Sequence, residues 1–162
     1  MSRARRLAGV GVAFALTACG GGAEEAIFCP RVDAVAGLDR LAIAYEGAGA
    51  PVPTALDVVD ATCVEEDGDL VVGTVLEIRL GPERPPGEVR VPYTIAVDTL
   101  EETRGSRAEI AVVPPGAAGV YEYHAHRFAG LAGRDDVRIR LLVALVPDEA
   151  ERERLAAERP RP

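Results

Sequence analysis

Hydrophobic and polar residues alternate with a period of two along much of this chain. The clearest run is 89–98, where every second residue from Val89 to Val97 is hydrophobic and the other face carries Arg90, Pro92, Thr94, Ala96 and Asp98. This period is typical of a strand with one face in a core. Weaker versions of the same pattern bring the number of predicted strands to seven, at 41–45, 59–63, 70–78, 89–98, 108–112, 121–128 and 137–145.

Turn-forming residues separate these segments. Glycine and proline cluster at 46–51, 81–87 and 114–116, and Glu66-Asp67-Gly68 predicts a hairpin. Strands with such loops, and no helix between them, predict an all-β fold: an antiparallel, immunoglobulin-like β-sandwich over residues 28–147. Pro92 cannot donate a hydrogen bond to a sheet, so its strand is expected at an edge or to be bulged there.

A short helix is expected at the C-terminal end, within residues 148–162. Asp148 has the position of an N-cap residue, with Glu151 three residues later. Leu155 is the one large apolar side chain of this segment, so the helix should be mostly solvated. The final Arg-Pro-Arg-Pro is expected to be extended and disordered.

The N-terminus follows another pattern. Three arginines within residues 3–6 precede ten apolar residues, 7–16, and the sequence Leu16-Thr17-Ala18-Cys19 follows. Ten residues cover about 15 Å of a bilayer core of about 30 Å, which is too short to span it. Charge, length and the cysteine together predict a lipoprotein signal peptide, residues 1–18, with acylation of Cys19. An uncleaved anchor is the alternative.

Acylation of Cys19 would attach the chain to a membrane. Residues 19–27 would then form the lipidated cysteine and a flexible, glycine-rich tether. Because Gly20 stands where an aspartate would signal retention in the inner membrane, we expect the outer membrane, facing the periplasm.

Removal of the signal peptide makes the chain more acidic. Three of the 18 arginines are lost, so 15 remain against 26 acidic residues, a formal charge of −11. Such a surface repels nucleic acid and anionic lipid headgroups, so no nucleic-acid partner is expected.

Two cysteines remain when Cys19 carries lipid. In an oxidising envelope a pair of thiols is expected to be joined, so we predict a disulfide between Cys29 and Cys63. Closing this loop would stabilise the fold by about 4 kcal/mol. Two unrelated buried thiols are the alternative.

Several of these features occur together in one family. The lipobox, the pair Cys29-Pro30, a second cysteine before an acidic glycine turn, and the strand 91–97 resemble small uncharacterised Gram-negative envelope lipoproteins. The resemblance extends to the last strand and to the residues 147–152 that follow it. It implies a disulfide and a sandwich, and carries no activity over to this chain.

The composition argues against several kinds of enzyme. The chain has no Lys, Asn, Gln or Trp, and Ser106 is the only serine after the signal peptide. A phosphate-binding lysine, a Schiff base and a Ser-Lys pair are therefore ruled out, and Ser106 lacks the glycine pattern of a nucleophile elbow. We expect no enzyme activity and no cofactor.

One group of residues could bind a metal. Alternate residues of a strand share a face, so Glu122, His124 and His126 would lie together, and imidazole with carboxylate suits Zn²⁺ or Cu²⁺. The alternative is a polar outer face, with Tyr121 and Tyr123 filling the core.

Three hypotheses therefore remain. We favour a lipid-anchored structural or protein-binding module with a partner in the envelope. The others are a metal-binding lipoprotein and an enzyme.

Overall fold

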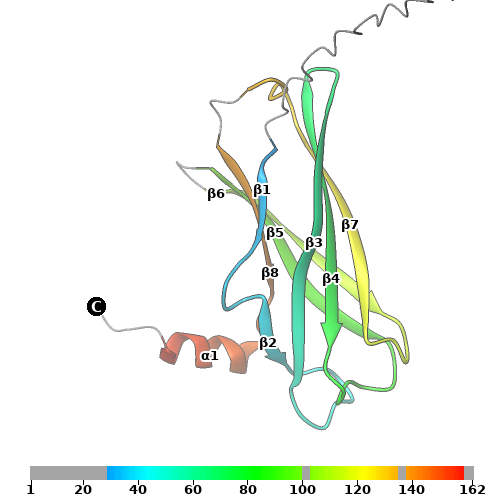
Figure 1. Ribbon diagram of the computed structural model, residues 1–162. Coiled ribbons are helices and arrows are strands. Elements are labelled where there is room, and N and C mark those ends of the chain that lie inside the picture. The colour runs from blue at the N-terminus through cyan, green and yellow to red at the C-terminus, as the bar shows by residue number, and fades with distance from the viewer. Residues whose placement is uncertain (1–28, 100–102, 135–137, 159–162) are drawn as a thin grey trace, which may run out of the picture.

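The structure is a computed structural model that describes residues 29–99, 103–134 and 138–158 (Figure 1). These residues form eight strands and one helix. The elements are β1 (Arg31–Ala34), β2 (Arg40–Ile43), β3 (Val52–Glu66), β4 (Asp69–Leu80), β5 (Val89–Thr99), β6 (Thr103–Val113), β7 (Gly119–Phe128), β8 (Ile139–Leu145) and α1 (Glu149–Glu158).

The strands form two four-stranded sheets. Sheet A has the order β1-β8-β5-β6 and sheet B the order β2-β3-β4-β7. All neighbours are antiparallel except β1 and β8, which run parallel. The predicted all-β sandwich is confirmed. It has one strand more than expected, because β1 is too short to show a clear alternation.

The core lies between the two sheets and follows the period of two. Along β4, alternate residues from Leu70 to Leu80 are buried, and along β5 the buried residues run from Val89 to Ile95. The largest fully buried side chains are Tyr93, Leu56, Leu76, Ile78, Leu141 and Leu145. Each sheet thus supplies one apolar face, as the alternation predicts.

The hairpin between β3 and β4 is confirmed. Asp67 and Gly68 both have a positive φ, 53° and 84°. Two such residues make the tight turn whose twist matches that of the flanking strands. The turn lets β3 and β4 pair along most of their length, with one bulge between Val58 and Asp60.

The expectation for Pro92 is wrong. Its strand, β5, lies inside sheet A between β8 and β6, and the register shift in its pairing with β6 falls at Ala96 and Val97, away from Pro92. Pro92 is tolerated because it lies where the pairing with β8 ends. Its carbonyl accepts a hydrogen bond from the N–H of Val146 (3.0 Å). Proline therefore removes only the return bond that an N–H at position 92 would donate to Val146.

The disulfide between Cys29 and Cys63 is present, with the two Cα atoms 5.7 Å apart. Cys29 precedes β1 in sheet A, and Cys63 lies in β3 of sheet B. The bond therefore joins the two sheets along one side of the sandwich. It also holds β1, which has only four residues with which to pair.

The helix α1 begins at the predicted N-cap. The carboxylate of Asp148 accepts a hydrogen bond from the N–H of Glu151 (2.8 Å) and another from the N–H of Ala44 (2.8 Å), next to β2. These N–H groups lower the pKa of Asp148, with that of Ala44 contributing most. The side chain of Glu151 is buried and pairs with Arg154 (2.6 Å). Leu155 packs against the core and most of the helix is exposed, as expected.

Candidate functional site

The predicted metal ligands lie on the inner face of β7, where the alternative hypothesis places the tyrosines. Glu122, His124 and His126 point towards sheet A and are partly buried, whereas Tyr123 is 74% exposed and Tyr121 is 53% exposed. The tyrosines therefore do not fill the core, and the polar residues are not on the outer face. Val120 and Phe128 explain the difference, because these apolar residues pack against the core and share the parity of the histidines.

His124 is held by a tyrosine of the opposite sheet. The hydroxyl of Tyr93, on β5, and Nε2 of His124 share a hydrogen bond of 2.6 Å, and the tautomer of the imidazole decides which group donates. The two rings meet edge to face, with their centroids 5.8 Å apart. Tyr93 is only 1% exposed, so its hydroxyl needs this partner.

Charges near this pair act on the phenol. Burial raises the pKa of Tyr93 most strongly, and the carboxylates of Glu122 and Glu109 raise it further, against a smaller opposing effect of Arg107. Glu109 lies opposite Tyr93 on β6 and forms an ion pair with Arg107. Strands β5, β6 and β7 thus bring a group of polar side chains to the inner faces of the two sheets. The group consists of the phenol of Tyr93 and the side chains of Arg107, Glu109, Glu122, His124 and His126.

His126 has no hydrogen-bond partner at Nε2, although this atom is buried. Its ring is stacked beside that of His124, with the centroids 6.2 Å apart and the planes at 29°. Burial, followed by the neighbouring His124, lowers the pKa of His126, so the neutral form is favoured.

The two imidazoles do not belong to a recognisable metal site. Among the residues that the structure describes, no three His, Cys, Asp or Glu side chains are arranged to hold a metal ion. The Nε2 atom of His124 is engaged by Tyr93, and Glu122 has the same inward parity without joining the histidines in such a group. Metal binding by Glu122, His124 and His126 stays a prediction.

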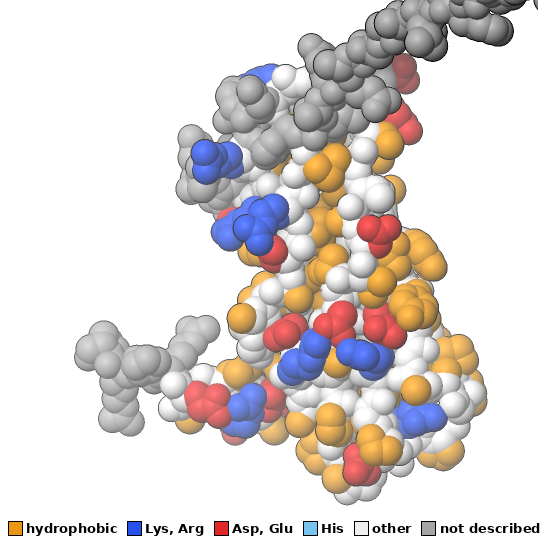
Figure 2. Space-filling view, in the orientation of Figure 1, with side chains coloured by type: hydrophobic (Ala, Val, Ile, Leu, Met, Phe, Trp, Pro, Cys, Tyr) orange, Lys and Arg blue, Asp and Glu red, His pale blue; other side chains and the backbone are white. Residues whose placement is uncertain are grey.

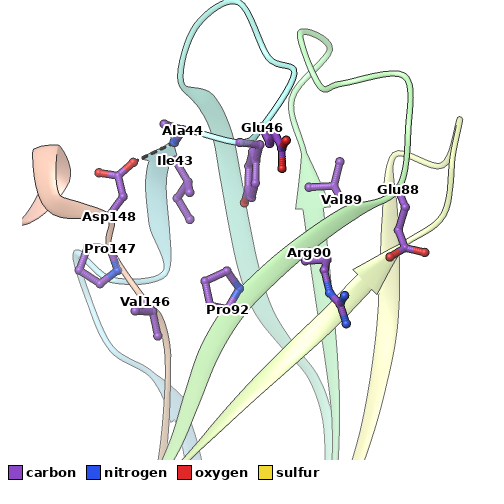
Figure 3. Close-up of a pocket in the computed structure, with 11 residues that line it drawn as sticks. Ile43, Ala44, Glu46, Glu88, Val89, Arg90, Pro92, Val146, Pro147 and Asp148 are labelled. Carbon is purple, nitrogen blue, oxygen red and sulfur yellow. Dashed lines mark hydrogen bonds between the residues drawn. The ribbon is translucent and has the colours of Figure 1, made fainter.

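A pocket that sequence reasoning missed opens at one end of the sandwich, with a volume of about 420 Å³. Figure 3 shows that it lies between the end of β2, the start of β5 and the segment after β8. Its walls are mainly apolar, and Glu46, Glu88, Arg90 and Asp148 supply charge. The carboxylate of Asp148 is already bound to two backbone N–H groups, so it serves the fold.

The outer face of sheet B is the second feature of interest. The half of this face nearest the β3–β4 hairpin presents apolar and aromatic side chains from three adjacent strands. In the pairing of β4 with β7, Val75 lies opposite Tyr123 and Gly73 lies opposite Ala125. Val64 and Val71 continue this surface across β3 and β4. We call it the tyrosine face and define it by Val64, Val71, Val75, Tyr121, Tyr123 and Ala125.

Ion pairs border the tyrosine face on two sides. Below it, Asp57 binds Arg40 (2.5 Å) and Arg79 (2.6 Å). Figure 2 shows acidic and basic side chains in a row across the middle of the molecule. Above it, Arg127 binds Glu66 (2.6 Å) and Asp69 (3.1 Å). Asp60 and Thr62 lie on the same face, opposite Val75 and Gly73, so the area is mainly apolar and aromatic with one carboxylate inside it. A mainly apolar area rimmed by charged groups has the composition of a protein-binding surface.

No protein-family model, no curated protein and no solved structure matches this chain. The described residues include no helix that is long and apolar enough to cross a membrane. The lipobox and Cys19 lie outside the described residues, as do the tether and the last four residues. The function is therefore argued from the chemistry of the surfaces above together with the N-terminal sequence.

Proposed function

We propose that this chain is a lipid-anchored lipoprotein of the bacterial envelope whose sandwich acts as a structural or protein-binding module. The anchor rests on the signal sequence and on Cys19, and the expected location is the outer membrane facing the periplasm. The Cys29–Cys63 disulfide suits an oxidising compartment. Since Cys29 follows Cys19 by ten residues, the domain would lie close to the membrane surface.

The tyrosine face is the observation that carries the binding role. Tyr121 and Tyr123 lie on the outer face of sheet B next to Val75, and more than half of each side chain is exposed. Tyrosine provides a large contact area with two rotatable bonds, which is why it is enriched in protein interfaces. The hydroxyl of Tyr121 donates a hydrogen bond to the carboxylate of Glu77 (3.1 Å), and this contact raises the pKa of the phenol.

The test is photo-crosslinking in the membrane of the native bacterium. A photoreactive amino acid replaces Tyr123 in the tyrosine face or, as the control, Ile110 on the outer face of sheet A, which is also more than half exposed. The proposal predicts a reproducible adduct with a different envelope protein from position 123, beside any adduct between copies of the chain, and none with that protein from position 110. Equal labelling at the two positions, or adducts only between copies of the chain, would contradict it.

Metal binding is a second candidate, which one observation favours. The Nε2 atom of His126 is buried without a partner beside the ring of His124, and an ion would satisfy it. Calorimetric titration of the chain with Zn²⁺ and Cu²⁺ tests this candidate. Binding that persists unchanged in His124→Ala/His126→Ala would exclude these histidines as ligands.

A further inference from the structure

The edge strand β7 differs from the other strands that border the two sheets. Strands β1 and β2 have four residues each, and the part of β3 that extends past β2 is linked by the disulfide to Cys29, which precedes β1. The pairing of β6 is interrupted by a register shift, and Gly105 has a positive φ of 70°. Short strands and irregular pairing are the usual ways to prevent association at an edge.

None of these protections is present in β7. It is ten residues long, contains no proline, and pairs with β4 in one unbroken register from Gly119 to Phe128. Its sequence is rich in residues that favour strands, among them Val120, Tyr121 and Tyr123. A long, regular edge of this kind is a template for a further strand.

The register identifies which backbone groups of β7 are free. The N–H of Leu80 donates to the carbonyl of Ala118 (2.8 Å), and the register places these two residues opposite each other. Hydrogen bonds in an antiparallel pair involve alternate residues, so the even-numbered residues of β7 bond to β4. The odd-numbered residues therefore direct their N–H and C=O groups outward, and the described residues make no hydrogen bond to them: Tyr121, Tyr123, Ala125 and Arg127.

The sequence of β7 is complementary to itself when it is read in the opposite direction. Consider a second copy placed antiparallel, with His124 opposite the second copy's His124. Glu122 then faces a histidine (His126), Tyr121 faces an arginine (Arg127), and apolar Val120 faces apolar Phe128. A carboxylate accepts a hydrogen bond from the N–H of a neutral imidazole, and a guanidinium beside an aromatic ring also stabilises a cross-strand pair.

This register also satisfies the free backbone groups. It pairs odd-numbered residues with odd-numbered residues, which are the ones whose N–H and C=O groups point outward. Registers shifted by two residues keep the hydrogen bonds and lose the complementarity. One of them puts Glu122 opposite Phe128, and the other puts Val120 opposite His126.

We propose that two copies of this chain associate through β7, antiparallel and centred on His124, so that sheet B continues from one copy into the other. The partner is thus a second copy of the chain. The tyrosine faces of the two copies would then form one continuous surface. The proposal does not depend on the lipid anchor or on the binding of another protein.

Proline at position 125 tests this proposal. The N–H of Ala125 points to the open edge, so Ala125→Pro removes a donor that β4 does not use. The matched control, Ala125→Val, keeps the N–H and adds a residue that favours strands. The mass of each whole chain is measured by light scattering in a large excess of non-ionic detergent, so that two chains rarely share a micelle by chance.

We expect dimers for the wild type and for Ala125→Val, and a monomer for Ala125→Pro with an unchanged circular dichroism spectrum. A monomeric wild type, or a dimeric Ala125→Pro, would overturn the proposal. If Ala125→Pro does not fold, cysteine pairing decides, because the register places position 123 opposite position 125. Their Cα atoms would be about 5.5 Å apart, within disulfide reach, whereas two copies of position 123 would be about 8 Å apart.

A mixture of Tyr123→Cys and Ala125→Cys chains should therefore form a disulfide-linked dimer under mild oxidation, and each variant alone should not. Equal linkage in the mixture and in the separate variants, or no linkage in either, would show that the copies do not pair in this register.

Discussion

Tyr93→Phe tests the orientation of β7 and the contact between the two sheets. The substitution removes only the hydroxyl that shares a 2.6 Å hydrogen bond with Nε2 of His124. Tyr93 itself is almost fully buried, and the imidazole is partly buried, so water cannot fully replace the lost partner. The nitrogen would remain desolvated without a hydrogen bond.

The expected loss follows from that unpaired nitrogen. Leaving one polar group buried without a partner costs about 1–3 kcal/mol. With a urea dependence of about 2 kcal/mol/M for a domain of this size, the unfolding midpoint should fall by about 0.5–1.5 M. Circular dichroism follows the transition through the loss of strand structure. It is preferred to fluorescence because the chain has no tryptophan.

The matched control is Tyr123→Phe, which makes the same chemical change on the exposed face. It should leave the midpoint nearly unchanged. In Tyr93→Phe/His124→Leu both partners are apolar, so this variant should lose less stability than the two single changes added together. Our assignment of the faces of β7 would be refuted if Tyr123→Phe destabilised the fold and Tyr93→Phe did not.

Three further predictions concern stability. Replacing Cys29 and Cys63 together by Ala should lower the free energy of unfolding by about 4 kcal/mol, as measured by urea denaturation; a loss below about 1 kcal/mol would show that the bond contributes little. Asp148→Ala removes the N-cap and the bond to Ala44, so it should cost about 1–2 kcal/mol and reduce the helical signal at 222 nm; an unchanged spectrum would contradict that role. Because the pKa of His126 is lowered in the fold, the unfolded chain takes up its proton more readily, so stability should be complete above about pH 6.5 and fall as the pH drops further. Melting temperatures between pH 7.5 and 5.5 test this, and His126→Leu should flatten the profile.

The sequence predicts the sandwich well because most strands have one largely apolar face. In β4 and β5 the buried residues alternate and all except Thr74 are hydrophobic, and the turn at Asp67 and Gly68 has the residues that a tight hairpin requires. The disulfide also follows from the count of cysteines. These features depend on local pattern and on composition, which a sequence displays directly.

The orientation of β7 could not be predicted in the same way. Both of its faces carry polar atoms, and the tyrosines at positions 121 and 123 are more hydrophobic than the histidines beside them. The decisive residues are Val120 and Phe128 at its two ends, together with Tyr93 on another strand, whose buried hydroxyl needs a partner. Only the pairing of the sheets brings that tyrosine to His124.

The pocket at the end of the sandwich had no local signal either. Its walls come from the end of β2, the start of β5 and the segment after β8, which are far apart in the sequence. Pro92 shows the same limit, since its place inside sheet A depends on where β8 ends. Such features follow from topology, which the period of two does not specify.

The intact mass of the protein extracted from its own membranes, recorded before and after reduction, tests the central claim most directly. We predict the mass of residues 19–162 plus the acyl groups on Cys19, and a gain of one pair of hydrogens when the Cys29–Cys63 disulfide is reduced. The mass of the whole 162-residue chain, or of a cleaved chain without lipid, would contradict a lipid anchor. An unchanged mass on reduction would contradict the disulfide.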